Sequence, residues 1–86
     1  MSKDKIGFIG AGNMATALIK GLIQSKLYGI DKIVASDNDL QKLKDLSGQF
    51  NVDVLSSNKE LVQKAGIIVL AVKPQIIKYV LEEVKD

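Results

Sequence analysis

Four short apolar runs alternate with segments of helical periodicity, and this alternation constrains the fold more than any other feature of the chain. The runs lie at residues 5–9, 32–36, 51–55 and 66–72. Strands that read as apolar runs and are separated by helices indicate a parallel sheet with helices on both faces. Right-handed crossovers leave few ways to connect such strands.

These rules predict an α/β fold. Its most favoured form is a Rossmann-like, doubly wound parallel sheet, here partial, with four strands in the order 3-2-1-4. At 86 residues the chain has room for one small domain, and we expect no linker or internal repeat.

The segments between the strands carry helix signals. A broad apolar face repeats over residues 13–26, and a shorter helix follows residue 39, which we expect Gly48 to close. The stretch "SNKE" fits a capping box. In it, the Ser57 side chain bonds the backbone N–H of Glu60, and the Glu60 side chain reaches back to the backbone N–H of Ser57. Pro74 suits the first turn of a last helix. Its predicted buried face consists of Ile76, Ile77, Val80, Leu81 and Val84.

Composition excludes several classes of function. The chain has no His and no Cys, so disulfides, thiolate nucleophiles and Cys/His metal sites are excluded within it. All twelve cations are Lys, they are scattered, and the net charge is only +2, so we expect no nucleic-acid surface. The first apolar run is short and broken by glycines. It predicts a strand and not a signal peptide or membrane span, which favours a cytoplasmic protein.

The stretch "GAGNMA" follows the first predicted strand and opens the first helix, which is the context of a G-x-G-x-x-A dinucleotide fingerprint. Gly10 permits the tight turn, and Gly12 lets the backbone approach a pyrophosphate. Ala15 keeps the helix close to the sheet. The helix start supplies free N–H groups and a positive dipole end. The motif therefore predicts a dinucleotide site, and the alternative is a tight turn that binds nothing.

The order of the predicted strands brings other polar residues to the same edge of the sheet. Ser36, Asp37 and Asn38 end the second strand, where the adenosine ribose lies in this fold. Asp37 would accept hydrogen bonds from the ribose hydroxyls and favour NAD, whereas neutral Ser36, Asn38 and Asn58 could bond a phosphate. Lys73 follows the fourth strand beside the crevice. From pattern alone, Lys73 could equally be a solvated lysine and Asn58 a residue of the capping box.

The stretches "IGFIGAGNMATALIKGL", "KIVAS", "SNKELV" and "IIVLAVKPQII" together resemble the N-terminal region of pyrroline-5-carboxylate reductase, from about Lys5 onward. The resemblance implies reduction of the cyclic imine 1-pyrroline-5-carboxylate to proline with NADPH, with NAD as the alternative cofactor. It implies that the glycine turn holds the pyrophosphate, that Ser36 and Asn58 contact the adenosine end, and that residues 71–74 line the nicotinamide side. The expected cofactor-binding residues are Ile9, Gly10, Ala11, Gly12, Asn13, Met14, Ser36, Asp37, Asn38, Asn58, Ala71, Val72, Lys73 and Pro74.

Members of that family continue into a helical domain that dimerises and completes the imine site. We therefore expect residues 1–86 to be the N-terminal part of a dinucleotide-binding domain, inactive alone, from a protein that forms a homo-oligomer. The chain offers no convincing proton donor, so we assign no catalytic residue and no metal ligand. Two alternatives stay open: a reductase of the β-hydroxyacid dehydrogenase type, and a non-catalytic dinucleotide-binding module.

Overall fold

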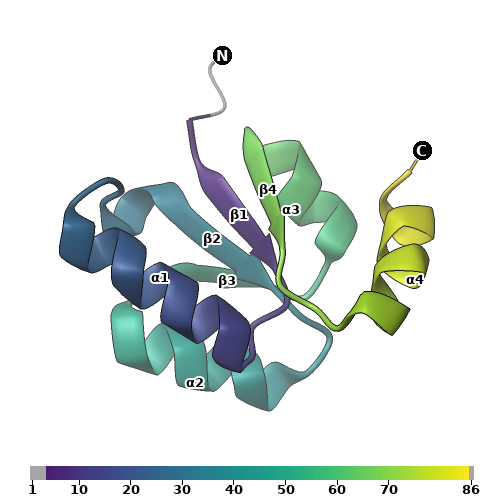
Figure 1. Cartoon of the computed structure of the whole chain (residues 1–86), viewed down its shortest axis with the longest axis horizontal. Coiled ribbons are helices and arrows are strands. Elements are labelled where there is room, and N and C mark those ends of the chain that lie inside the picture. Colours follow the sequence, from purple (N-terminus) through teal and green to yellow (C-terminus); the bar gives the residue numbers. More distant parts are fainter. Residues whose placement is uncertain (1–3, 86) are drawn as a thin grey trace.

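The computed structural model describes residues 4–85, in which four parallel strands form one sheet in the order β3-β2-β1-β4. The strands are β1 (Ile6–Ile9), β2 (Ile33–Ser36), β3 (Asp53–Leu55) and β4 (Ile67–Leu70). All four arrowheads in Figure 1 point to the same edge of the sheet. The predicted fold class and strand order are therefore confirmed.

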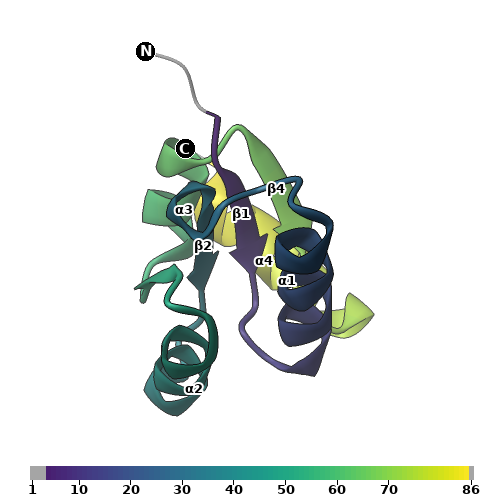
Figure 2. The same ribbon diagram turned by 90° about the vertical axis from the view of Figure 1, so that its left-hand side faces the viewer.

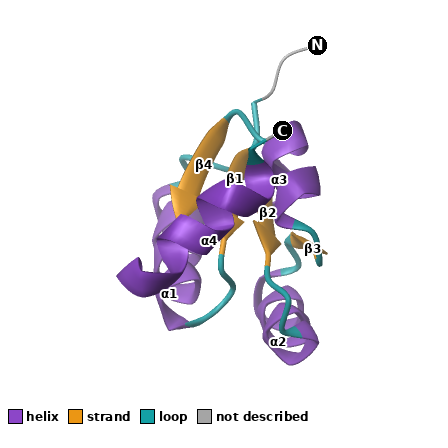
Figure 3. Cartoon of the chain, turned by 90° about the vertical axis from the view of Figure 1, so that its right-hand side faces the viewer, coloured by secondary structure: helices purple, strands orange, loops and turns teal. Residues whose placement is uncertain are grey.

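Helices cover both faces of this sheet. Figure 2 shows α1 (Asn13–Ser25) and α2 (Leu40–Phe50) in front of the strands. Figure 3, viewed from the opposite side, shows α3 (Asn58–Lys64) and α4 (Pro74–Val84) in front of them. A short 3₁₀ turn, η1 (Ile30–Lys32), leads into β2.

The strands alternate their side chains between two apolar clusters, one on each face. Phe8 and Ile33 pack with Ile19 of α1 in the first cluster. Ile9 packs with Leu61 of α3 in the second cluster. Because successive side chains of a strand point to opposite faces, each short strand contributes to both cores. This explains why β1 and β4 read as continuously apolar in the sequence.

Gly7 in the middle of β1 is required by the packing of α3. A Cβ atom at this position would lie 2.8 Å from Ala65 Cβ and 2.8 Å from Leu61 Cδ2. Both of those residues are buried. Gly7 therefore lets α3 approach the central strand, and it has no direct part in the glycine turn that follows.

The start of β1 is tied to η1 by an exposed ion pair. Lys32 Nζ donates a hydrogen bond to Asp4 Oδ2 at 2.7 Å. This hydrogen bond lowers the pKa of Asp4 and raises the pKa of Lys32. The pair lies away from the carboxyl edge of the sheet, so it has no bearing on the site described below.

The expectation that Gly48 closes the second helix is wrong. The helix α2 continues through Phe50, and the left-handed residue at its end is Asn51, with a φ of 59°. The Asn51 N–H donates to the Ser47 carbonyl at 2.8 Å. Asn tolerates this conformation better than other non-glycine residues, and Phe50 packs against the core, so the helix gains by reaching it.

Replacing Gly48 by Ala should therefore stabilise the protein. The position is inside α2, and a Cβ atom there would meet nothing within 4 Å. We expect the free energy of unfolding to rise by about 0.5–1 kcal/mol, because alanine lowers the entropy of the unfolded chain and favours the helix. Urea denaturation measures this. Gly7→Ala is the matched control and should destabilise; a loss of stability in Gly48→Ala would contradict the assignment.

Two further helix expectations are confirmed in part. Ser57 Oγ accepts a hydrogen bond from the Glu60 N–H at 3.1 Å, as predicted, but the Glu60 carboxylate pairs with Lys64 at 3.7 Å instead of reaching back. In α4, Val80 is buried, but two residues of its predicted face, Ile76 and Leu81, are 42% and 52% exposed. A helix packed on one side only buries a narrower stripe than the sequence pattern suggests.

Candidate dinucleotide-binding site

The turn after β1 can be made only with glycine at position 10. Gly10 has a φ of 108°, which L side chains rarely adopt. A Cβ atom here would run into the carbonyl group of Ala71 and lie 2.9 Å from Val72 Cγ1. The Gly10 N–H donates to the Ser36 carbonyl at 2.7 Å. The predicted role of Gly10 in a tight turn is confirmed, and the turn joins the ends of β1, β2 and β4.

Gly12 leaves the start of α1 open. It is the N-cap residue, with no side-chain cap, and its carbonyl accepts hydrogen bonds from the Thr16 N–H and hydroxyl. An added Cβ atom would meet only Lys42 Nζ, at 3.9 Å. The first N–H groups of a helix lack intrahelical partners, and the helix dipole is positive there. This turn therefore offers an anion exposed backbone donors in a space that a side chain would fill.

Asp37 ties the glycine turn to the segment that follows β2. Its Oδ2 atom accepts a hydrogen bond from the Ala11 N–H at 2.9 Å. Its Oδ1 atom accepts one from the Asp39 N–H, also at 2.9 Å. The sequence placed this carboxylate against ribose hydroxyls and gave no sign of these bonds. The carboxylate thus holds the loop in place, and the contact to a ribose stays a prediction.

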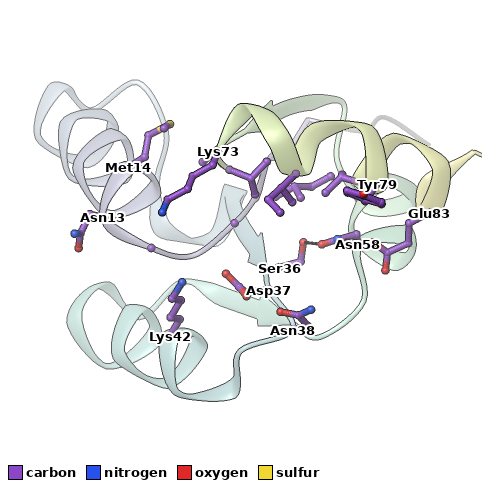
Figure 4. Close-up of a pocket in the computed structure, with 17 residues that line it drawn as sticks. Asn13, Met14, Ser36, Asp37, Asn38, Lys42, Asn58, Lys73, Tyr79 and Glu83 are labelled. Atoms are coloured by element: carbon purple, nitrogen blue, oxygen red, sulfur yellow. Dashed lines mark hydrogen bonds between the residues drawn. The ribbon is translucent and has the colours of Figure 1, made fainter.

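A chain of hydrogen bonds crosses the other side of the same edge. Ser36 is fully buried, and its hydroxyl donates to Asn58 Oδ1 at 2.6 Å. Asn58 Nδ2 donates to Glu83 Oε1 at 2.9 Å. Figure 4 shows these side chains meeting between the end of β2 and α4. The amide of Asn58 therefore joins β2, α3 and α4, a role separate from the capping box that Ser57 serves.

These features border one cleft of about 810 Å³ at the carboxyl edge of the sheet (Figure 4). Ala11 instead borders a smaller neighbouring hollow beside α2, and Pro74 lies outside the lining, at the first position of α4. The cleft brings together most of the residues that the sequence singled out. They are Ile9, Gly10, Gly12, Asn13, Met14, Ser36, Asp37, Asn38, Asn58, Ala71, Val72 and Lys73.

Five residues that line the cleft were not predicted from the sequence: Lys42, Ile76, Tyr79, Val80 and Glu83. The last four lie on α4, which runs from the end of β4 to a contact with Asn58. No sequence signal gives the direction of a helix across a sheet. Lys42 could have been found, because α2 begins beside the end of β2 and its first turn must face the same edge.

The fold agrees with comparisons to known proteins. Residues 5–86 match the family model described as NADP oxidoreductase, coenzyme F420-dependent. The chain belongs to this family. The match spans the glycine turn, both ends of the cleft and all four strands.

Comparisons with individual proteins give a more specific match than the family model does. The chain is 41% identical over 86 residues to a pyrroline-5-carboxylate reductase of Methanosarcina acetivorans, covering all of this chain and 32% of that protein. The structure of a pyrroline-5-carboxylate reductase from Coxiella burnetii superposes with a TM-score of 0.86 at 36% identity, over 95% of this chain and 30% of that one. The resemblance predicted from the motifs is confirmed.

A second solved relative contains a ligand. The crystal structure of Plasmodium falciparum pyrroline carboxylate reductase with NADP bound has a TM-score of 0.79 and 30% identity, over 99% of this chain and 30% of that one. The chain spans about a third of the length of the relatives that it matches.

Residues 4–85 contain neither a membrane-spanning helix nor a cluster of metal ligands. No helix there is long and apolar enough to cross a lipid bilayer. In the same part of the chain, no three His, Cys, Asp or Glu side chains lie close enough together to hold a metal ion.

Proposed function

We propose that this chain is the cofactor-binding part of a reductase that converts 1-pyrroline-5-carboxylate to proline with NADPH, with NADH as the alternative donor. The observation that carries the proposal is the continuous cleft from Gly12 to Lys73, across the neighbouring strands β1 and β4. Ligands of doubly wound sheets bind at this switch point. The relative solved with NADP has the same fold, which supports the choice of cofactor.

The proposed roles follow from position. The open turn at Gly12 and the first N–H groups of α1 hold the pyrophosphate. The end of β2 and Asn58 receive the adenosine, and residues 71–74 flank the nicotinamide. The bound cofactor supplies a hydride to the imine carbon, and the imine nitrogen takes up a proton. The chain's own residues bind and orient the cofactor, and none of them is assigned as the proton donor.

The remaining parts of the proposal rest on the resemblance. We propose that a helical domain outside these residues completes the imine site and forms a homo-oligomer, and that residues 1–86 are the N-terminal part of the dinucleotide-binding domain. We also propose the cytoplasm as its location.

The proposed function predicts that the product of the complete gene is active and that the 86-residue chain alone is inactive. The product of the complete gene should oxidise NADPH only when pyrroline-5-carboxylate is added, with proline formed in equal amount. The 86-residue chain should bind NADPH weakly and form no proline. Nicotinamide absorbance and amino-acid analysis measure both. Proline formed by the 86-residue chain would contradict the prediction that this chain is inactive alone. A complete gene product that oxidises NADPH with β-keto acids, or binds it without turnover, would favour one of the two alternatives.

A further inference from the structure

Lys42 extends from α2 into the cleft, where neither the sequence motifs nor the resemblance gives it a role. It is the third residue of α2 and is exposed. It borders both the main cleft and the smaller hollow beside Ala11. Its Nζ atom lies 3.9 Å from where a Cβ atom of Gly12 would be, so the charge stands beside the glycine turn. Figure 4 shows Lys42 and Lys73 reaching toward the cleft from opposite sides.

The acidic groups around Lys42 are already engaged. Both oxygens of Asp37 accept backbone N–H groups. Asp39 caps α2 by accepting from the N–H groups of Gln41 and Lys42. Asp45 accepts from the side-chain amide of Gln41 at 2.9 Å. Among the ion pairs of residues 4–85, none includes Lys42. Its positive charge therefore faces the cleft without a protein partner.

The position of this charge determines which ligand group it meets. Lys42 borders the cleft together with Asp37 and Asn38, at the end of β2 where this fold places the adenosine ribose. In such domains an Arg near this point accommodates a 2′-phosphate. This chain contains no Arg. A Lys can serve the same purpose as a point charge, without the bidentate geometry.

We propose that Lys42 binds the 2′-phosphate of NADPH and thereby sets a preference for NADPH over NADH. The proposal rests on the proposed function, since it needs a dinucleotide in the cleft. The acidic side chain that would oppose a 2′-phosphate, Asp37, is turned toward the Ala11 N–H, which lowers its repulsion of that group. Lys42 and the engaged Asp37 thus form one specificity element.

The test compares Lys42→Met with Lys42→Arg and a control, Lys44→Met. Lys44 is exposed on the same helix but does not border either cavity. Dissociation constants for NADPH and NADH are measured by calorimetry on each variant. Lys42→Met removes a charge-assisted contact at an exposed site. The dissociation constant for NADPH should therefore rise by about tenfold, and that for NADH should stay within about twofold of the parent value. Lys42→Arg should restore NADPH binding, and Lys44→Met should change neither constant.

The probes 2′,5′-ADP and 5′-AMP, which differ only in the 2′-phosphate, locate the contact on the ligand. Lys42→Met should weaken the binding of 2′,5′-ADP alone. Added salt should reduce the difference in affinity for this probe between the variant and the parent chain. Equal losses of affinity for NADPH and NADH, or for both probes, would place the ammonium on the phosphates attached to the 5′ oxygen and overturn the proposal. Wild-type affinity in Lys42→Met would also overturn it while leaving the proposed function intact. Failure of the unaltered chain to bind either dinucleotide would overturn both.

Discussion

Gly10→Ala is expected to unfold much of the protein and to abolish cofactor binding. A side chain at a φ of 108° costs about 1–3 kcal/mol. The added Cβ atom would also collide with the Ala71 backbone, which must move to admit it, at a further cost of about 1–3 kcal/mol. We therefore expect the free energy of unfolding to fall by about 2–6 kcal/mol, measured by urea denaturation.

Gly21→Ala is the control for this change. Gly21 lies inside α1, and an added Cβ atom there would meet nothing within 4 Å. This variant should be as stable as the parent chain or more so. If Gly10→Ala retained its stability to within about 1 kcal/mol, the backbone geometry described for the turn would be incorrect.

Gly12→Val is expected to separate binding from folding. Gly12 has a φ of −90° and faces open space, so a side chain fits without backbone strain. Since valine is a poor N-cap, the loss of stability should be at most about 1 kcal/mol. The valine methyl groups would occupy the space through which a pyrophosphate reaches the N–H groups of α1. Loss of those charge-assisted hydrogen bonds should lower the affinity for NADPH by about a hundredfold or more.

Calorimetric titration with NADPH measures this loss. Gly12→Ala, with a single methyl group, should give an intermediate affinity, and Gly21→Val, on the exposed side of α1, should leave the affinity unchanged. A Gly12→Val chain that binds NADPH as tightly as the parent would show that the phosphates lie elsewhere. A large loss of stability would instead indicate that the space above the turn is filled in solution.

The features that the sequence predicted well are those that local geometry imposes. Only glycine fits the positive φ at Gly10, and only alternation between a strand and a helix gives a parallel sheet of this order. The features that it missed depend on contacts between distant segments. Asp37 bonds Ala11 across 26 positions of the chain, and Asn58 bonds Glu83 across 25. Neither hydrogen bond produces a recognisable pattern in the spacing of residues along the sequence.

The end of α2 shows how packing overrides local preference. Gly48 is the stronger terminator by propensity, but Phe50 lies two residues further on and packs against the first core cluster. Burial of an aromatic side chain outweighs the small cost of a glycine inside the helix and an Asn in the left-handed region.

We propose that a dinucleotide spans the cleft with its phosphates over Gly12. An amide-resolved NMR titration of this chain with NADPH tests it most directly. We expect the largest chemical-shift changes at Gly12, Asn13 and Met14, smaller ones at Asn38 and Lys73, and none at Lys5, at the opposite edge of the sheet. Unshifted glycine-turn amides at saturating NADPH, or shifts confined to another surface, would contradict it.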